Sequence, residues 1–375
     1  MTTDSHPGRA TGQHRLDVSA DVVDLTQQLC DIPSPSGQET ALADAVEQAL
    51  RDCPHLSVLR DGDAVVAHTP DGPAERVVVA GHLDTVPVGT FDGRPNVPSW
   101  RAPGADGTPA LWGRGSVDMK GGIAMALSVA ATVPEPNRQT TWVFYDHEEV
   151  DTALNGLGRL QRNHPEWLQA DFAVLGEPSN GTVEGGCNGT IRVQVRTSGV
   201  AAHSARAWKG RNAIHAAAPI LATLAQYRAG EVEVDGLVFR ESLGAVRIGG
   251  GIANNVVPDE CVVTVNYRFA PSRTPQQAEA FLRELFDGYD VTVTDVAGGA
   301  RPGLHHPAAA AFVAAIGQPP APKYGWTDVA RFAELGVPAV NFGPGDPLLA
   351  HRDDEHCPLD SLRAARTALY TWLTG

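Results

Sequence analysis

Short apolar runs rich in β-branched residues, separated by helical patterns, constrain the fold of this chain most. The runs are Arg76–Gly81, Thr140–Asp146 and Asp171–Leu175, and each has the length of a strand buried on both faces. Helical patterns stand before and between them, at Asp21–Cys30, Glu39–Arg51, Gly122–Ala131 and Ala153–Asn163. Such an alternation is typical of a mostly parallel sheet covered by helices. The sequence therefore predicts an α/β fold.

The pattern changes near residue 190. Ile191–Thr197 alternates apolar and polar residues, as a strand does when one face of its sheet is solvated. A helix with one apolar stripe is predicted at about Asn212–Tyr227, and Thr274 opens another helix with a capping-box spacing. Further alternating strands are predicted at Leu243–Ile248, Cys261–Phe269 and Asp290–Val296. The α/β pattern then returns, with predicted elements at Pro307–Ile316, Pro338–Phe342 and Ser361–Leu373.

We therefore expect two domains, which agrees with about 150 residues per domain in a chain of 375 residues. Residues 16–188 and 299–375 would form the α/β domain, and residues 189–298 an inserted α+β domain. Residues 1–15 are polar, with no apolar core, and are expected to be a disordered tail. A cleft between two such domains is a common place for a ligand.

Polar clusters follow the predicted strands of the α/β domain. They comprise His82 and Asp84 after the first run, Glu148 and Glu149 after the second, Glu177 after the third, and His351 after Pro338–Phe342. Open α/β sheets place their ligands at the carboxyl ends of strands. Taken singly, each cluster has a simpler explanation, such as a structural histidine, a solvated helix start or an exposed charge run. Their shared location predicts a functional site.

The residue types of these clusters suit a metal centre. Two histidines among several carboxylates fit zinc, manganese or cobalt better than calcium. A site for two metal ions needs a bridging carboxylate, further ligands on each ion and a free base. Asp118 lies just before a predicted helix, so a helix N-cap is its alternative explanation. Asp84, two residues beyond His82, is placed to bond the second nitrogen of that imidazole.

Charge and cysteine content exclude several classes of protein. Lys and Arg number 29 against 44 Asp and Glu, and a net charge of −15 repels nucleic acid and anionic membranes. No apolar window approaches the roughly 18 residues of a membrane span. The five cysteines are far apart and form no C-x-x-C pair, which argues against a disulfide framework and a thiolate zinc site. We expect a cytoplasmic protein that binds neither nucleic acid nor a membrane.

From about residue 20 onward, the sequence resembles the di-zinc aminoacylase and carboxypeptidase-like amidohydrolases. The matching motifs are Gly81–Pro87 (GHLDTVP), Arg114–Gly122 (RGSVDMKGG), Asp146–Glu149 (DHEE), Gly176–Pro178 (GEP) and Ala350–His351. The resemblance implies a catalytic domain with two Zn²⁺ ions, for which Co²⁺ or Mn²⁺ can substitute. It also implies an inserted domain that serves as lid and dimerisation domain. The expected activity is hydrolysis of a small N-acyl amino acid by a homodimer.

Carried over residue by residue, the resemblance implies a ligand set for each zinc ion. His82, Asp118 and Glu177 would hold one ion, and Asp118, Glu149 and His351 would hold the other. Asp118 would therefore bridge the two ions. No metal-site position departs from the pattern of the family.

The resemblance also implies three catalytic roles. Glu148 would act as general base and then as general acid. Asp84 would orient His82. His203 would stabilise the oxyanion from the partner subunit of the dimer, its alternative being an ordinary loop histidine. A cis peptide bond is expected at Asp118–Met119.

Within the family, further segments resemble actinobacterial members that remove succinate from N-succinyl-L,L-diaminopimelate, a reaction of lysine and diaminopimelate biosynthesis. These segments are residues 186–190, 203–208, 249–258, 266–269 and 325–328. Because that substrate carries several carboxylates, arginine is its best side-chain partner. The candidate substrate-binding residues are Arg268, Arg206, Asn255 and Thr327.

Two alternatives stay open at this point. One is a deacylase for another N-acyl amino acid, acetylornithine first among them, or a small dipeptidase. The other is a non-catalytic binding protein that keeps the fold. The presence of Glu148 and of every implied metal ligand argues against the second alternative.

Overall fold

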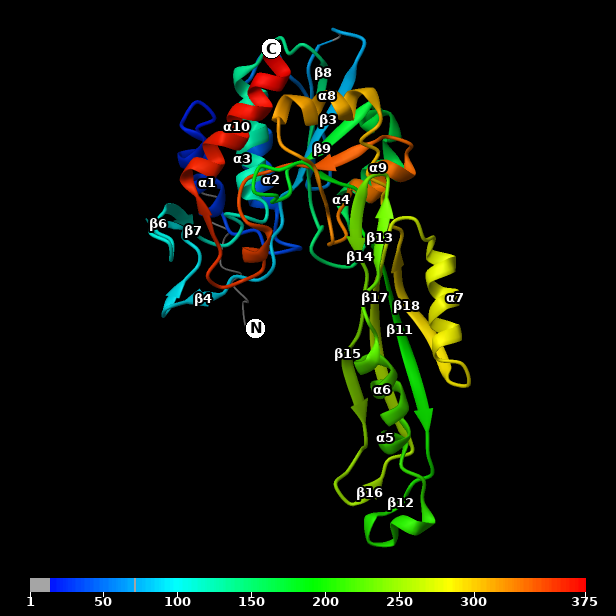
Figure 1. Ribbon diagram of the computed structural model, residues 1–375. Helices are drawn as coiled ribbons and strands as arrows, with labels where there is room; N and C mark the ends of the chain where they lie inside the picture. The colour runs from blue at the N-terminus through cyan, green and yellow to red at the C-terminus, as the bar shows by residue number, and fades with distance from the viewer. Residues whose placement is uncertain (1–13, 71) are drawn as a thin grey trace, which may run out of the picture. The chain divides into compact units, whose positions relative to one another are not determined.

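The computed structural model describes residues 14–70 and 72–375 (Figure 1). The tail predicted at residues 1–15 therefore lies, except for its last two residues, outside the described residues. None of the helices in the described part of the chain has the length and apolar character needed to cross a membrane.

The chain divides into two compact units. The first unit comprises residues 1–183, 311–318 and 341–375, and the second comprises residues 184–310 and 319–340. The segment expected as an inserted domain, residues 189–298, falls wholly within the second unit, which extends beyond it on both sides.

The first unit contains the predicted α/β elements. Its strands are β1 (Ser57–Asp61), β2 (Ala64–His68), β3 (Arg76–His82), β4 (Thr90–Phe91), β5 (Arg94–Pro95), β6 (Trp100–Pro103), β7 (Pro109–Trp112), β8 (Gln139–Tyr145), β9 (Phe172–Leu175) and β21 (His356–Pro358). Its helices are α1 (Val22–Cys30), α2 (Thr40–Arg51), α3 (Lys120–Thr132), α4 (Gly156–Asn163) and α10 (Leu359–Thr374), with 3-10 turns at Pro165–Leu168 and Pro347–Leu349. Helix α8 (Pro307–Ile316) and strand β20 (Ala339–Asn341) each span a boundary between the units.

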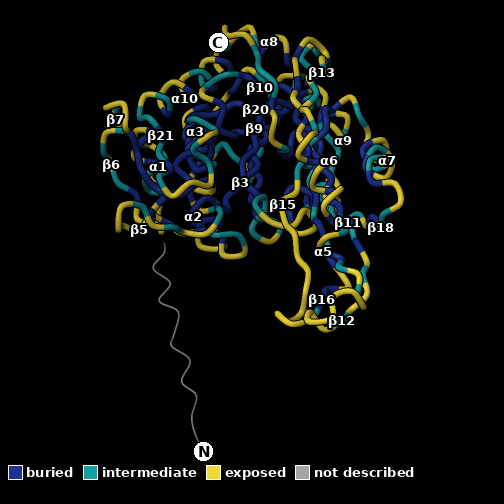
Figure 2. Tube along the Cα trace, turned by 60° about the horizontal axis from the view of Figure 1, so that its bottom comes forward, coloured by how far each residue is buried: buried dark blue, intermediate teal, exposed yellow. Residues whose placement is uncertain are grey.

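The main sheet of the first unit has the strand order β1-β2-β8-β3-β9-β20. Its centre, β8-β3-β9, is parallel, and β1 and β2 join it by antiparallel pairing. The central strands are apolar and buried on both faces, as parallel strands under helices must be (Figure 2). This arrangement is the predicted mostly parallel α/β sheet.

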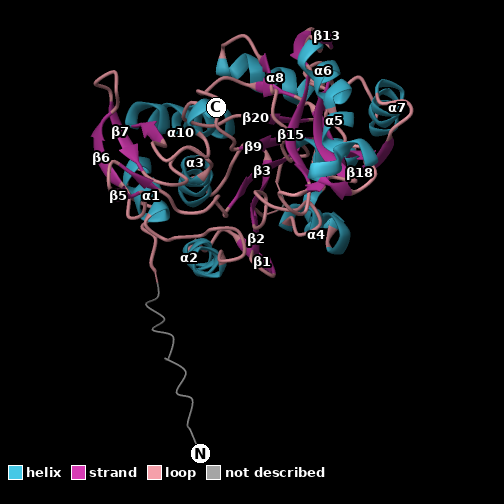
Figure 3. Cartoon of the chain, turned by 90° about the horizontal axis from the view of Figure 1, so that it is seen from below, coloured by secondary structure: helices cyan, strands magenta, loops and turns pink. Residues whose placement is uncertain are grey.

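Helix α3 packs against β3 and β8 and lies beside α1 and α10 (Figure 3). Its residues from Lys120 to Ala130 are all buried, which matches a helix without a polar face. The first turn of α3 approaches the loop after β9 closely, because a Cβ atom on Gly122 would lie 2.0 Å from the carbonyl oxygen of Gly176. Glycine at position 122 therefore lets two segments of the functional site touch through their backbones.

The second unit is an α+β unit. Its strands are β10 (Glu184–Gly185), β11 (Gly189–Ser198), β12 (Ala202–His203), β13 (Glu231–Val234), β14 (Leu237–Arg240), β15 (Ser242–Gly250), β16 (Val256–Val257), β17 (Glu260–Phe269), β18 (Asp290–Ala297) and β19 (Ala321–Pro322). Its helices are α5 (Ala213–Ala216), α6 (Ala218–Gln226), α7 (Pro275–Leu285) and α9 (Val329–Glu334), with a 3-10 segment at Ser204–Lys209. Strands β15-β17-β11-β18 form an antiparallel sheet, and α5, α6 and α7 pack on its apolar face.

The single helix predicted at Asn212–Tyr227 is wrong, because the structure has two helices there, α5 and α6. Pro219 explains the break, since it lacks the N–H that would bond to the carbonyl oxygen of His215. The capping box predicted at Thr274 is present, with both of its hydrogen bonds to Gln277.

We predict that Gly122→Ala destabilises the protein by about 1–3 kcal/mol, because the added methyl group overlaps backbone that cannot rotate away. The free energy of unfolding measured in urea checks this. Gly325→Ala is the matched control, since nothing lies within 4 Å of the corresponding Cβ position. Equal stability of the two variants would contradict the prediction.

Candidate metal centre

His82 ends strand β3 and is buried. Its Nδ1 lies 2.9 Å from the main-chain oxygen of Asp84. Because a carbonyl oxygen only accepts, Nδ1 donates, and Nε2 points toward Asp118 Oδ1, 3.2 Å away. The carboxylate of Asp84 lies farther from the imidazole, with Oδ1 at 3.5 Å from Nδ1. The closest contact between the two residues is therefore made by the main chain of Asp84.

The Asp84 carboxylate fixes the loop that follows β8. Its Oδ1 accepts the N–H of Glu148 at 2.9 Å, and its Oδ2 accepts the N–H of Glu149 at 3.0 Å. The Ser36 hydroxyl donates a third bond, to Oδ2, at 2.7 Å. Burial alone would raise the pKa of Asp84, but its interactions with His82 and these donors lower it to about 2. Asp84 is thus ionised at neutral pH and holds two adjacent backbone N–H groups.

Asp118 presents one carboxylate oxygen to each of two histidines. Oδ1 lies 3.2 Å from His82 Nε2, and Oδ2 lies 3.2 Å from His351 Nε2. The Asp118–Met119 peptide bond is cis, as expected. The alternative of a helix cap is wrong, because Met119 stands at the N-cap of α3 and no side chain caps that helix. One oxygen toward each imidazole is the arrangement that a carboxylate shared by two metal ions requires.

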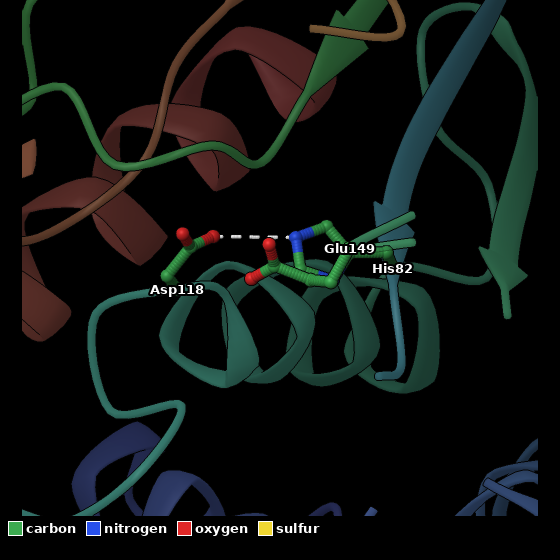
Figure 4. Close-up of side chains that lie close together, drawn as sticks. All are labelled: His82, Asp118 and Glu149. Carbon is green, nitrogen blue, oxygen red and sulfur yellow. Dashed lines mark hydrogen bonds and ion pairs between the residues drawn. The ribbon is translucent and has the colours of Figure 1, made fainter. Parts of the chain in front are cut away.

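Glu149 and Glu177 lie on either side of this pair. Glu149 Oε2 is 2.9 Å from His351 Nε2, and Glu177 Oε1 is 4.0 Å from His82 Nε2. Ligand atoms of His82, Asp118 and Glu149 all lie within 4.8 Å of one another (Figure 4). The structure therefore brings the five residues expected as metal ligands into one cluster, with imidazole and carboxylate donors that suit zinc.

The charges of the cluster alter the pKa values of both histidines. Burial by itself lowers the pKa of His82, but its bonds to Asp118 and Asp84 outweigh burial and hold the pKa well above the usual range. Hydrogen bonds to Asp118 and Glu149 raise the pKa of His351 to about 10. Burial opposes ionisation of Asp118, yet the two histidines lower its pKa below the usual range. Without metal, both imidazoles are therefore protonated at neutral pH.

A buried acid that no sequence motif marks also supports this cluster. Glu355 is buried, and its Oε1 accepts the N–H groups of Val117 and Asp118 at 2.9 and 3.1 Å. Arg114 Nη1 donates to its other oxygen at 2.9 Å. Burial raises the pKa of Glu355 to about 7. Its neighbours in sequence form a charged run, and no local signal distinguishes it, because its partners lie about 240 residues earlier in the chain.

The other expected site residues lie in the second unit. His203 is exposed in β12, its Nδ1 accepts the N–H of Ala205, and the neighbouring N–H of Ser204 donates to Asn255 O at 2.8 Å. Arg206 is exposed in the same region, the 3-10 segment Ser204–Lys209. Arg268 and Thr327 lie elsewhere in the second unit.

Arg268 is half-buried near the end of β17, and burial lowers its pKa. His203 pairs with Val256, just before the start of β17. From Glu260 to Arg268 an extended strand covers about 26 Å at 3.3 Å per residue. The second unit thus places His203 and Arg268 at opposite ends of one strand, and buries Thr327 before α9.

Residues 78–374 match the sequence model of peptidase family M20/M25/M40. The chain belongs to this family. It is 44% identical to the succinyl-diaminopimelate desuccinylase of Corynebacterium glutamicum, over 96% of this chain and 98% of that protein. It is 51% identical to a Mycobacterium tuberculosis protein with the provisional name succinyl-diaminopimelate desuccinylase DapE, over 96% of this chain and all of that protein.

Solved structures of the family share the fold. A tripeptidase from Staphylococcus aureus superposes with a TM-score of 0.75 at 20% identity, covering 96% of this chain and 98% of that chain. A Bacillus subtilis protein described as a dinuclear metal-binding peptidase gives 0.68 at 16% identity, covering 94% and 96%. These likenesses establish the M20 fold for this chain.

We predict that metal binding releases protons, because a ligand imidazole must be neutral and both histidines are protonated in the metal-free cluster. Binding should therefore tighten as the pH rises toward 10. Calorimetric titration of metal-free protein with Zn²⁺, in buffers of different ionisation enthalpy, measures the number released.

His351→Asn should release about one proton fewer than the wild type at neutral pH, because it removes one raised imidazole. His215→Gln, in α5 of the second unit, is the control and should leave the number unchanged. A heat of binding that does not depend on the buffer would contradict the prediction.

Proposed function

We propose that this chain is a succinyl-diaminopimelate desuccinylase, which hydrolyses N-succinyl-L,L-diaminopimelate to succinate and L,L-diaminopimelate. The observation that carries the proposal is Asp118, whose two oxygens face His82 and His351, in a chain whose full-length relatives bear this name. The reaction would serve lysine and diaminopimelate biosynthesis.

In this proposal the cluster holds two zinc ions, with Co²⁺ or Mn²⁺ as alternative metals. His82, Asp118 and Glu177 would hold one ion, and Asp118, Glu149 and His351 the other. The donor set fits, because two imidazoles and several carboxylates converge there. Bound zinc would supply Lewis acidity, which lowers the pKa of water to about 7 and polarises the amide carbonyl.

Glu148 is the proposed general base. It takes a proton from the attacking water and later gives that proton to the departing amine. Its position supports this role, since its N–H is fixed by Asp84 and it directly precedes the proposed ligand Glu149. Asp84 would therefore align both the base and, through His82, one metal ligand.

The proposed substrate carries several carboxylates, so its recognition needs positively charged side chains, whereas the first unit has a large excess of acidic residues. That unit carries 30 acidic and 15 basic residues, whereas the second unit carries 14 of each. Residues 185–230 of the second unit contain no Asp or Glu at all. We propose that Arg268 and Arg206 bind substrate carboxylates, with Asn255 and Thr327 as neutral donors.

We predict that zinc-loaded protein hydrolyses N-succinyl-L,L-diaminopimelate much faster than N-acetylornithine, because the acetyl group lacks the carboxylate that an arginine would bind. Release of the free amine measures both rates, with a chelator as the control for metal dependence. Glu148→Gln should retain its metal and lose about 100- to 10,000-fold in kcat. Preference for the acetyl substrate would refute the assigned specificity, and full turnover by the variant would refute the base.

We also propose a cytoplasmic homodimer formed through the second unit. The edge strand β15 supports this, since it exposes Val246 and Ile248 along an unpaired side of the sheet. The separation of His203 from Arg268 along β17 supports a shared site, in which His203 would come from the partner subunit to stabilise the oxyanion. All five cysteines are free and buried, which suits a reducing compartment.

We predict that His203→Ala lowers kcat about 100- to 1,000-fold with little change in KM, as expected for a contact made in the transition state. Steady-state kinetics measure the two constants. Sedimentation velocity at assay concentrations should give the mass of a dimer. A fully active monomer would remove the proposed role of the partner subunit.

A further inference from the structure

The segment Ser34–Glu39, which precedes α2, is bound to the loop after β3. The N–H of Thr85 donates to Ser34 O at 2.9 Å, and the N–H of Ser36 donates to Thr85 O at 3.1 Å. The Ser34 hydroxyl donates to Leu83 O at 2.7 Å. This segment therefore has a fixed position relative to the first loop of the metal centre.

Glu39 ends the segment with a carboxylate that is buried, at 1% exposure. Its Oε1 accepts the N–H of His147 at 3.2 Å and lies 3.4 Å from Nδ1 of the same residue. Its Oε2 is buried with no hydrogen-bond partner among the residues that the structure describes. Glu39 stands at the N-cap of α2 but makes no side-chain cap bond. Because the carboxylate makes no cap bond, helix capping does not offset the free-energy cost of burying it, and another role has to explain this residue.

His147 has an unusual backbone conformation, with φ at +60°, where a residue other than glycine needs support from its surroundings. Its Nδ1 lies 2.7 Å from Asp146 Oδ2. Asp146 is itself held by two bonds from Arg159, at 2.6 and 3.0 Å. The N–H groups of the next two residues, Glu148 and Glu149, both donate to the Asp84 carboxylate.

We propose that Glu39 is a positioning residue for the general base. It acts through His147, whose N–H and imidazole it contacts, and keeps that residue in its left-handed conformation. This conformation sets the direction of the chain between the end of β8 at Tyr145 and Glu148, and therefore the position of Glu148. The inference rests on the proposed function for its account of Glu148, but the geometric role of Glu39 does not depend on the substrate.

Loss of Glu39 is expected to displace Glu148, the proposed base, and to leave the neighbouring residues Glu149 and Asp84 largely in place. A misplacement of about 1 Å can cost about 100-fold in rate. The N–H of Glu149 still has Asp84 as its acceptor, and Asp84 still has Ser36, so the metal ligands remain held. Substrate binding, which the proposal assigns to the second unit, is not involved.

The test compares Glu39→Ala with Glu39→Gln in the full-length, zinc-loaded protein. Glu39→Ala should lower kcat at least 10-fold, with KM within twofold and metal content unchanged. Glu39→Gln keeps an oxygen acceptor for the N–H of His147 and should restore most of the rate. Glu47→Ala, which removes an ion-paired carboxylate from α2, is the matched control and should leave kcat unchanged.

A double-mutant cycle with His147→Ala tests the route of the effect. If Glu39 acts through His147, the loss of rate in the double variant should be smaller than the product of the two single losses, because the variants remove a shared contact while the N–H of residue 147 remains. If the loss of kcat in the double variant equals the product of the two single losses, the proposal is overturned. A loss of kcat in Glu39→Ala that is proportional to its loss of bound zinc would also overturn it.

Amide hydrogen exchange separates this inference from the proposed function. In Glu39→Ala the N–H group of Glu148 should exchange faster than in wild type, and Glu47→Ala should leave it unchanged. This readout needs no substrate, so it stands even if the wild type fails to hydrolyse the succinyl compound. Unchanged exchange in Glu39→Ala would refute the positioning role.

Discussion

Repulsion among carboxylates is the constraint on which the arrangement of the first unit depends. Asp84 and Glu177 are buried and Asp118 is largely buried, and all three lie within reach of one imidazole, His82. Gathering such charges out of water is unfavourable unless each has a partner. The fold provides partners in the form of main-chain N–H groups for Asp84 and two histidines for Asp118. The parallel sheet matters here because it brings these segments to one edge.

Much of this framework could be predicted from the sequence, because it depends on local patterns. The apolar runs that become β3, β8 and β9 are too short and too β-branched for helices, and the polar residues after them follow from the geometry of parallel strands. The location of the polar residues at strand ends could be predicted for the same reason, whereas the assignment of individual metal ligands, Asp118 among them, rests on the family resemblance. His82 and Glu149 each stand within a few residues of a strand end.

The residues that support the site could not be predicted in this way. Glu39 and Glu355 are two acids among 44, and what distinguishes them is burial against segments about 100 and 240 residues away. The segment from β4 to β7 contains strands of only two to four residues, which are too short to show a periodic pattern of apolar and polar residues. The hairpin β13–β14, by contrast, has a local sequence signal, Asp235–Gly236 between alternating residues, which is typical of a two-residue turn.

The residues of the cluster are widely separated along the chain, which affects when the site can form during translation of the protein. A ribosome delivers Ser36, Asp84 and Asp118 more than 230 residues before His351 and Glu355. Until that later segment folds back, Asp118 lacks its second imidazole, and its N–H lacks an acceptor. A cation that meets the nascent chain therefore finds an incomplete set of donors. Maturation of the site therefore has to wait for synthesis of residues 351–355, and a chain terminated before them remains without the finished centre.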